Sequence, residues 1–186
     1  MMSEWIGELV AALAREFGDK PHVATLATVD KSGAPRARTV ICRKVSAEGA
    51  VLVVSDARSE KNEQLKAVPQ AEVVFWLPTL REQYRVFGST RMMSASLPDP
   101  ARLDMWKSLS DAARALFFWP SPGIRRLDQP DAFPQAVSAE TPPPTSFEVL
   151  MVRPRRVEHL QLNMHPHRRR RWMLAGKWSA ASEINP

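Results

Sequence analysis

Apolar residues recur at two spacings along the chain and divide its first half into helical and extended segments. One helix is predicted over residues 3–17, inside an N-terminal helical region of residues 1–20, because apolar residues there recur every three or four positions. Short apolar runs between turn residues predict strands over residues 22–29, 34–45, 51–55, 72–77 and 81–90. A helix of about residues 60–67 is expected after the third strand, with Ser59 as its N-cap.

The second half begins with helices and ends with strands. Asp99 and Pro100 have the residue types of a helix cap and a first turn, and Ser110 starts another helix that ends near Phe118. Residues 120–145 contain seven prolines and no periodicity, which predicts a long loop. Strands are expected over 146–153, 155–163 and 169–175. The pattern predicts one α+β domain over residues 1–186, mainly β and built on an antiparallel barrel.

Strand alternation assigns several side chains to faces. On a regular strand Arg38 and Arg43 point to opposite faces, so they could share a ligand only if the strand bends. Gln83 shares a face with Arg85 and Phe87, which is typical of a sheet that is half buried. The faces therefore decide which basic residues can act together.

The charge balance indicates which classes of partner the protein could bind. The net charge is +6 and the sequence pI is near 10.0, which suits nucleic acid, an anionic membrane surface or an anionic small ligand. Four consecutive arginines, Arg168–Arg171, contribute to it, although such a run is often only a solvated face. No apolar run is long enough to cross a membrane, and the start lacks a secretory signal, so we expect a cytoplasmic protein. The single Cys42 is expected to be a small core residue.

The motif search leaves a cationic site. The sequence has no phosphate-binding P-loop, no dinucleotide-binding glycine motif and no zinc-protease helix, and His165 and His167 lack the partners of a metal site, so no metal is expected. Arg58 and Lys61 stand beside the predicted start of the helix at residues 60–67, where exposed N–H groups attract anions. Lys61 could instead be simply solvated. Together with Arg38 and Arg43, these residues favour a phosphorylated ligand.

Five segments in order resemble one protein family. They are RTVICR (38–43), SDARSEKNEQL (55–65), FWLPTLREQYRVFG (75–88), LSDAARALFFWPSPG (109–123) and HPHRRRRW (165–172). The order resembles the pyridoxamine 5′-phosphate oxidase-like family of FMN-binding split barrels, in particular its oxidase-related subgroup. The resemblance implies an antiparallel split β-barrel with flanking helices, and a homodimer with FMN at the protomer interface.

The resemblance also implies the site residues. Arg38 matches the arginine that opens the FMN-binding segment, and Arg43 stands where the family usually has a lysine. Gln83 matches a flavin contact from the partner chain, and Leu160 stands where the oxidases have a tryptophan. The full set of implied cofactor-binding residues is Arg38, Thr39, Val40, Arg43, Ser55, Lys61, Gln83, Ser121 and Arg170.

The resemblance also implies a function, to which the sequence leaves two alternatives. The resemblance implies an FMN-dependent oxidoreductase that acts on an undetermined small molecule, with a B6 vitamer as one candidate. The substrate side departs from the family, because Trp106, Ser110 and Arg114 occupy the region that holds the substrate phosphate in the oxidases. A flavin- or haem-related binding module without oxidase activity is therefore a second reading. A nucleic-acid-binding protein that uses the four arginines is a third.

Overall fold

The computed structural model describes residues 3–96 and 99–186, and its described residues form two compact units. The first unit comprises residues 3–53, 64–91 and 151–186, and the second comprises residues 54–63 and the described part of 92–150. The single domain expected from the sequence stays a prediction.

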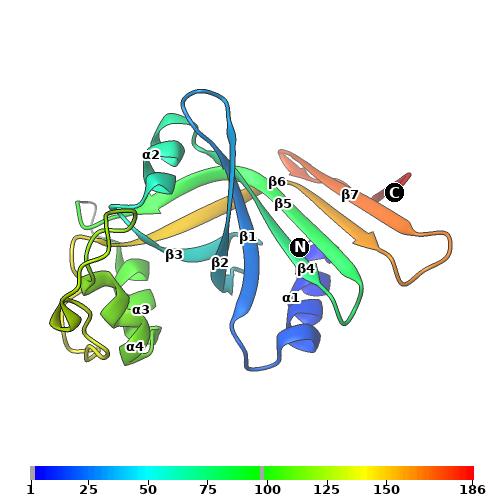
Figure 1. The fold of residues 1–186 in the computed structure, drawn as a ribbon. Helices are drawn as coiled ribbons and strands as arrows, with labels where there is room; N and C mark the ends of the chain where they lie inside the picture. The colour runs from blue at the N-terminus through cyan, green and yellow to red at the C-terminus, as the bar shows by residue number, and fades with distance from the viewer. Residues whose placement is uncertain (1–2, 97–98) are drawn as a thin grey trace. The chain divides into compact units, whose positions relative to one another are not determined.

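The structure consists mainly of strands, with a few helices (Figure 1). The helices are α1 (Glu4–Phe17), α2 (Glu60–Ala67), α3 (Pro100–Ser108) and α4 (Asp111–Ala115), with short 3-10 turns at Leu116–Phe118 and Pro130–Ala132. The strands are β1 (His22–Val29), β2 (Pro35–Val45), β3 (Val51–Asp56), β4 (Gln70–Leu77), β5 (Glu82–Met93), β6 (Phe147–Gln161), β7 (Arg168–Ala175), β8 (Lys177–Trp178) and β9 (Ser182–Ile184).

The strands form one antiparallel sheet that closes on itself. Its order is β3-β2-β1-β4-β5-β6-β7-β8, and β3 also pairs with β6. The first six strands of this order therefore make a closed barrel, while β6 continues into a long hairpin with β7 (Figure 1). The predicted α+β, mainly β, barrel class is confirmed.

The alternation predicted for β5 is present and divides the interior from the outer face. Glu82, Tyr84 and Val86 are buried, whereas Gln83 and Arg85 are half-buried on the opposite face. Because directly opposed residues of antiparallel strands share a face, the pairs Gln83–Trp76 and Arg85–Val74 extend the outer face onto β4. Helix α1 buries Trp5, Leu9 and Leu13 within the first unit.

Strand β2 does bend, at Arg43. Cys42 pairs with Val53 and Lys44 pairs with Leu52, so one extra residue of β2 lies between two successive pairs. Such a bulge interrupts the two-residue alternation. The faces of Arg38 and Arg43 therefore cannot be deduced from their spacing alone.

Strand β6 runs unbroken through Pro154, where two separate strands were expected. Proline has no backbone N–H to donate, but its backbone can adopt the extended conformation of a strand. The sheet therefore lacks one hydrogen bond at this position. Gly88 of β5 lies directly beside this point: a Cβ there would lie 1.8 Å from the carbonyl oxygen of Arg153. The absent side chain allows the two backbones to approach.

The second unit has an aromatic core of its own. Trp106, Phe117 and Phe147 are buried and meet edge to face, with ring centroids 4.8–6.1 Å apart. Asp99 and Ser110 cap α3 and α4, as their residue types predict, by accepting hydrogen bonds from Ala101 N and Ala113 N.

Candidate functional site

Arg38 anchors a polar cluster inside the first unit. Its Nη1 donates to Thr28 Oγ1 at 2.6 Å and to the Leu26 carbonyl at 3.2 Å, and its Nη2 donates to Gln64 Oε1 at 2.7 Å. Thr28 also donates to Gln64 Oε1, at 2.7 Å. Because Thr28 and Gln64 are buried, the guanidinium group is held in a defined place between β1 and α2.

The other residues expected on β2 differ in exposure. Val40 shares the inner face with Arg38 and is half-buried, because their partners Ala24 and Leu26 are buried residues of β1. Thr39 is exposed on the outer face, opposite Thr25, which in turn pairs with Val74. Arg43 is exposed at the bulge. The structure therefore separates Thr39 from Arg38 and places it on the same outer face as Gln83.

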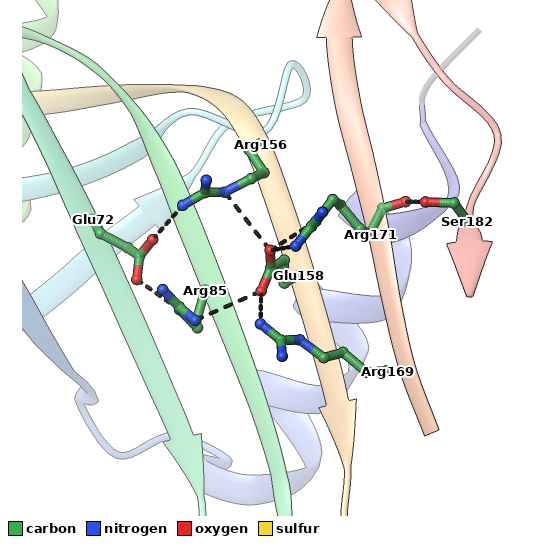
Figure 2. A network of polar contacts seen from close by, with 7 residues as sticks. All are labelled: Glu72, Arg85, Arg156, Glu158, Arg169, Arg171 and Ser182. Atoms are coloured by element: carbon green, nitrogen blue, oxygen red, sulfur yellow. Dashed lines mark hydrogen bonds and ion pairs between the residues drawn. The ribbon is translucent and has the colours of Figure 1, made fainter. Parts of the chain in front are cut away.

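The outer face carries a network of arginines and glutamates across β4, β5, β6 and β7 (Figure 2). Glu158 of β6 lies at its centre and accepts from Arg169 at 2.5 Å and from Arg171 at 2.8 Å. Arg85 and Arg156 approach the same carboxylate at 3.6 and 3.8 Å. Both of these also bind Glu72, at 2.7 and 3.2 Å respectively. We call Glu72, Arg85, Arg156, Glu158, Arg169 and Arg171 the arginine network.

The arginine network changes the electrostatics of a buried acid. Burial by itself raises the pKa of Glu158, but the hydrogen bonds from Arg169 and Arg171 outweigh it, and the pKa lies below its usual value. The four guanidinium groups exceed the two carboxylates by two charges. The arginine network therefore carries a net positive charge on the outer face.

Arg170 points to the other face of β7, into the first unit. It donates to Glu8 of α1 through two nitrogens, at 3.0 and 2.6 Å, and its Nη2 also lies 3.0 Å from Nδ1 of His159. His159 Nε2 lies 2.9 Å from Glu82, and the imidazole ring stacks on Tyr84 with centroids 4.0 Å apart. Arg170 is thus engaged in the interior, whereas Arg169 shares the outer face with Leu160 and Gln83.

The second unit holds the residues around the start of α2. Ser55 is buried and donates to Asn62 Oδ1 at 2.8 Å, and Lys61 donates to Ser59 Oγ at 2.8 Å. The Ser59 hydroxyl donates to the Asp56 carbonyl at 2.6 Å. Arg58 forms two hydrogen bonds with the Asp56 carboxylate, at 2.9 and 2.6 Å. Lys61 therefore stands in the first turn of α2, as the sequence predicted, whereas Arg58 is paired with an acid.

The long loop is fastened to α3 and α4 by buried donors. Arg102 Nη2 donates to the Pro144 carbonyl at 2.9 Å, the Trp106 indole donates to Thr141 at 2.7 Å, and Arg114 Nε donates to Val137 at 2.8 Å. Arg114 also donates to the carbonyls of Trp106 and Leu109 and pairs with Asp111. Trp106 and Arg114 thus hold the loop, and Ser110 caps α4. These are the three residues that the resemblance implies for the substrate-phosphate region. Ser121 is half-buried within the loop.

Sequence reasoning missed Thr28 and Gln64. A threonine on the buried face of an otherwise apolar strand was an available signal, but the partnership with Gln64 depends on how α2 packs, which spacing does not reveal. Within the described residues, no group of three or more His, Cys, Asp or Glu side chains is placed to hold a metal ion. No helix in that part of the chain is long and apolar enough to cross a membrane.

Three comparisons place the chain among known proteins. Residues 2–94 match the family model described as pyridoxamine 5′-phosphate oxidase, FMN-binding domain. The pyridoxine/pyridoxamine 5′-phosphate oxidase of Rhodococcus jostii (strain RHA1) is 31% identical over 96% of this chain and 81% of that protein. The crystal structure of a pyridoxamine 5′-phosphate oxidase-related, FMN binding protein from Nostoc punctiforme PCC 73102 is 33% identical, with a TM-score of 0.91 over 100% of both chains.

A more distant structure shares the fold. PhzG from Burkholderia lata 383 has a TM-score of 0.78 over 98% of this chain and 89% of that one, at 19% identity. The resemblance stated from five sequence segments is confirmed by the family model and by the relatives above 30% identity. The chain belongs to the pyridoxamine 5′-phosphate oxidase family.

Proposed function

We propose that this protein is an FMN-dependent oxidoreductase that acts on a small molecule. The observation that carries the proposal is the match of residues 2–94 to an FMN-binding domain model, a range that contains Arg38, Arg43, Ser55, Lys61 and Gln83. The cytoplasm is the proposed compartment.

The donor set fits the chemistry of FMN. The phosphate of FMN is a dianion, which favours a guanidinium group such as that of Arg38 in the first unit. In the second unit, Lys61 and the partial positive charge at the N-terminus of the eight-residue helix α2 favour an anion for the same reason. The buried Thr28 and Gln64 hold Arg38 in one conformation, so less conformational entropy is lost when it binds an anion. Thr39, Val40, Arg43, Ser55 and Ser121 remain proposed contacts.

A homodimer is part of the proposal, with the outer face of the barrel between the two copies. Val23, Trp76 and Met173 are apolar residues of that face and are 43, 44 and 47% exposed, so a second copy would remove apolar surface from water there. Gln83 lies on the same face and would reach the partner's flavin. The resemblance implies a cofactor-binding residue at Arg170; we assign this role to Arg169 instead, because Arg170 is bound to Glu8.

The chain's own side chains would bind and orient the cofactor. Arg38 and Lys61 would neutralise the phosphate, while Gln83 would donate or accept at the polar edge of the ring system. Bound FMN would supply the two-electron redox chemistry. No protein nucleophile is required.

A second candidate is a flavin-binding module of the same fold without oxidase turnover. One observation favours it: Trp106 and Arg114 donate hydrogen bonds to carbonyl oxygens of the loop, and Ser110 caps a helix. These side chains are therefore engaged in local structure. Reduction of bound flavin by pyridoxamine phosphate under anaerobic conditions would favour the oxidase, whereas a yellow protein that stays oxidised would favour the module.

The proposed phosphate site is tested by two substitutions. Arg38→Ala and Lys61→Ala should each weaken FMN binding by about 1–3 kcal/mol, because each removes a charge-assisted hydrogen bond. Quenching of FMN fluorescence during titration measures the affinity. Arg36→Ala is the matched control, since Arg36 is on the same strand but is exposed and paired with Asp30.

Two results would contradict the proposal. One is an affinity unchanged in both variants. The other is a purified protein without flavin absorbance near ~370 and ~450 nm that also refuses added FMN.

A further inference from the structure

The second unit contains a cavity of about 530 Å³ within the long loop. This volume lies in the range of small-molecule sites, roughly 300–1,000 Å³. Its walls contain two aromatic residues, Trp119 and Phe133, and two apolar residues, Leu127 and Pro130. They also contain one charge of each sign, Arg126 and Asp128, and two glutamines.

The aromatic walls are fixed in place. The Trp119 indole donates to the Pro134 carbonyl at 2.8 Å, and its ring meets Phe133 edge to face, with centroids 5.4 Å apart and planes at 79°. The loop that carries them is fastened at Val137, Thr141 and Pro144 by the buried donors described above. A planar ring could therefore stack there without first ordering the loop.

One cation faces this space. The Arg126 guanidinium lies 5.7 Å from the centroid of the Phe133 ring and, among the described residues, forms no ion pair. It is the positive charge of the cavity wall, and Asp128 is the negative one. A guanidinium group binds a carboxylate through two parallel hydrogen bonds. A second negative charge on a ligand would be repelled by Asp128.

We propose that this cavity binds a planar aromatic monocarboxylate, with the ring against Trp119 and Phe133 and the carboxylate on Arg126. Nothing in this proposal depends on flavin binding. It also agrees with the engagement of Trp106, Ser110 and Arg114 in local structure, because a ligand held by Arg126 needs none of them.

Isothermal titration calorimetry of the full chain with naphthoate tests the site. We expect saturable binding with one site per chain, weakened roughly tenfold or more in Arg126→Gln, because a charge-assisted hydrogen bond is lost. Arg125→Gln is the matched control: Arg125 is the neighbouring residue of the same charge, is not part of the cavity wall, and should leave affinity unchanged. Trp119→Leu should weaken binding. It should also remove the part of the tryptophan fluorescence quenching by naphthoate that comes from Trp119.

Several outcomes would overturn the proposal. These are no saturable binding of naphthoate to the wild type, equal affinity in wild type and Arg126→Gln, or equal losses in Arg125→Gln and Arg126→Gln. Naphthyl phosphate binding more tightly than naphthoate would overturn the preference for a single negative charge. Circular dichroism of each variant separates loss of binding from loss of folding.

Discussion

Gly88 has the tightest backbone environment among the glycines of the chain. A Cβ at this position would lie 1.8 Å from the carbonyl oxygen and 2.5 Å from the carbonyl carbon of Arg153, and both of these are backbone atoms that cannot rotate away. Strands β5 and β6 would have to separate to admit even one methyl group. The residue is therefore required by the approach of two strands and not by a turn.

Gly88→Ala should lower the free energy of unfolding by about 3 kcal/mol or more, because overpacking against backbone exceeds the usual cost of an added methyl group. Gly7→Ala is the matched control. Gly7 lies in α1 with nothing within 4 Å of its Cβ position, so alanine should stabilise the protein there by about 0.5–1 kcal/mol. Urea unfolding measures both, and equal effects would contradict the argument.

At the scale of elements, a buried polar chain connects α1 to three strands. Glu8 of α1 binds Arg170 of β7, which lies against His159 of β6, which in turn contacts Glu82 of β5. Since Arg170 donates to Nδ1, the imidazole is neutral and carries its proton on Nε2, facing Glu82. Burial lowers the pKa of His159 against the opposing effect of Glu82.

This connection predicts a pH dependence. Below pH ~6.5, His159 of the unfolded chain binds a proton that His159 of the folded chain does not bind. The free energy of unfolding should therefore decrease as the pH is lowered, by up to about 1.4 kcal/mol per pH unit, until the pH reaches the pKa of His159 in the folded protein. Urea unfolding between pH ~7.5 and ~5.5 measures the slope. His159→Gln should flatten it, whereas His167→Gln, in the exposed β6–β7 turn, should not. A slope identical in wild type and His159→Gln would refute the assignment.

Elements that depend on local pattern could be predicted, and elements that depend on distant packing could not. Alternation along Gln83–Phe87 gave the faces of β5, and the caps Asp99 and Ser110 gave the starts of α3 and α4. The bulge at Arg43 and the unbroken β6 at Pro154 depend on the neighbouring strands, which the local sequence does not encode.

The same distinction applies to the site. Residue types and order identified Arg38 and Lys61 as candidates, but the burial of Thr28 and Gln64 around Arg38 required the fold. Within the run Arg168–Arg171, the family resemblance implied Arg170 as the cofactor-binding residue. Strand pairing places Arg170 inside, with Glu8, and puts Arg169 beside Leu160 on the outer face.

At the scale of the whole molecule, the outer face of the barrel sets the expected assembly. Trp76→Glu should weaken the proposed homodimer roughly thirtyfold or more, about 2 kcal/mol, because a buried aromatic anchor would be replaced by an unpaired charge. Sedimentation velocity over a range of concentrations measures it. Leu116→Glu is the control, since Leu116 is similarly exposed, at 47%, and lies outside the sheet.

The dimer proposal fails if the wild type sediments as a monomer at every concentration, or if Trp76→Glu associates as the wild type does. A dimer lost equally in both variants would point to a general effect of added charge.

The central position of Glu158 also constrains how this chain can diverge. Four guanidinium groups lie within 4.0 Å of one carboxylate, and the carboxylate is buried beneath them. Replacing the acid first would leave four like charges facing one another with only Glu72 to offset them, whereas losing an arginine first leaves a carboxylate that still has three partners. The network should therefore tolerate the loss of one arginine better than the loss of the acid that the four arginines share.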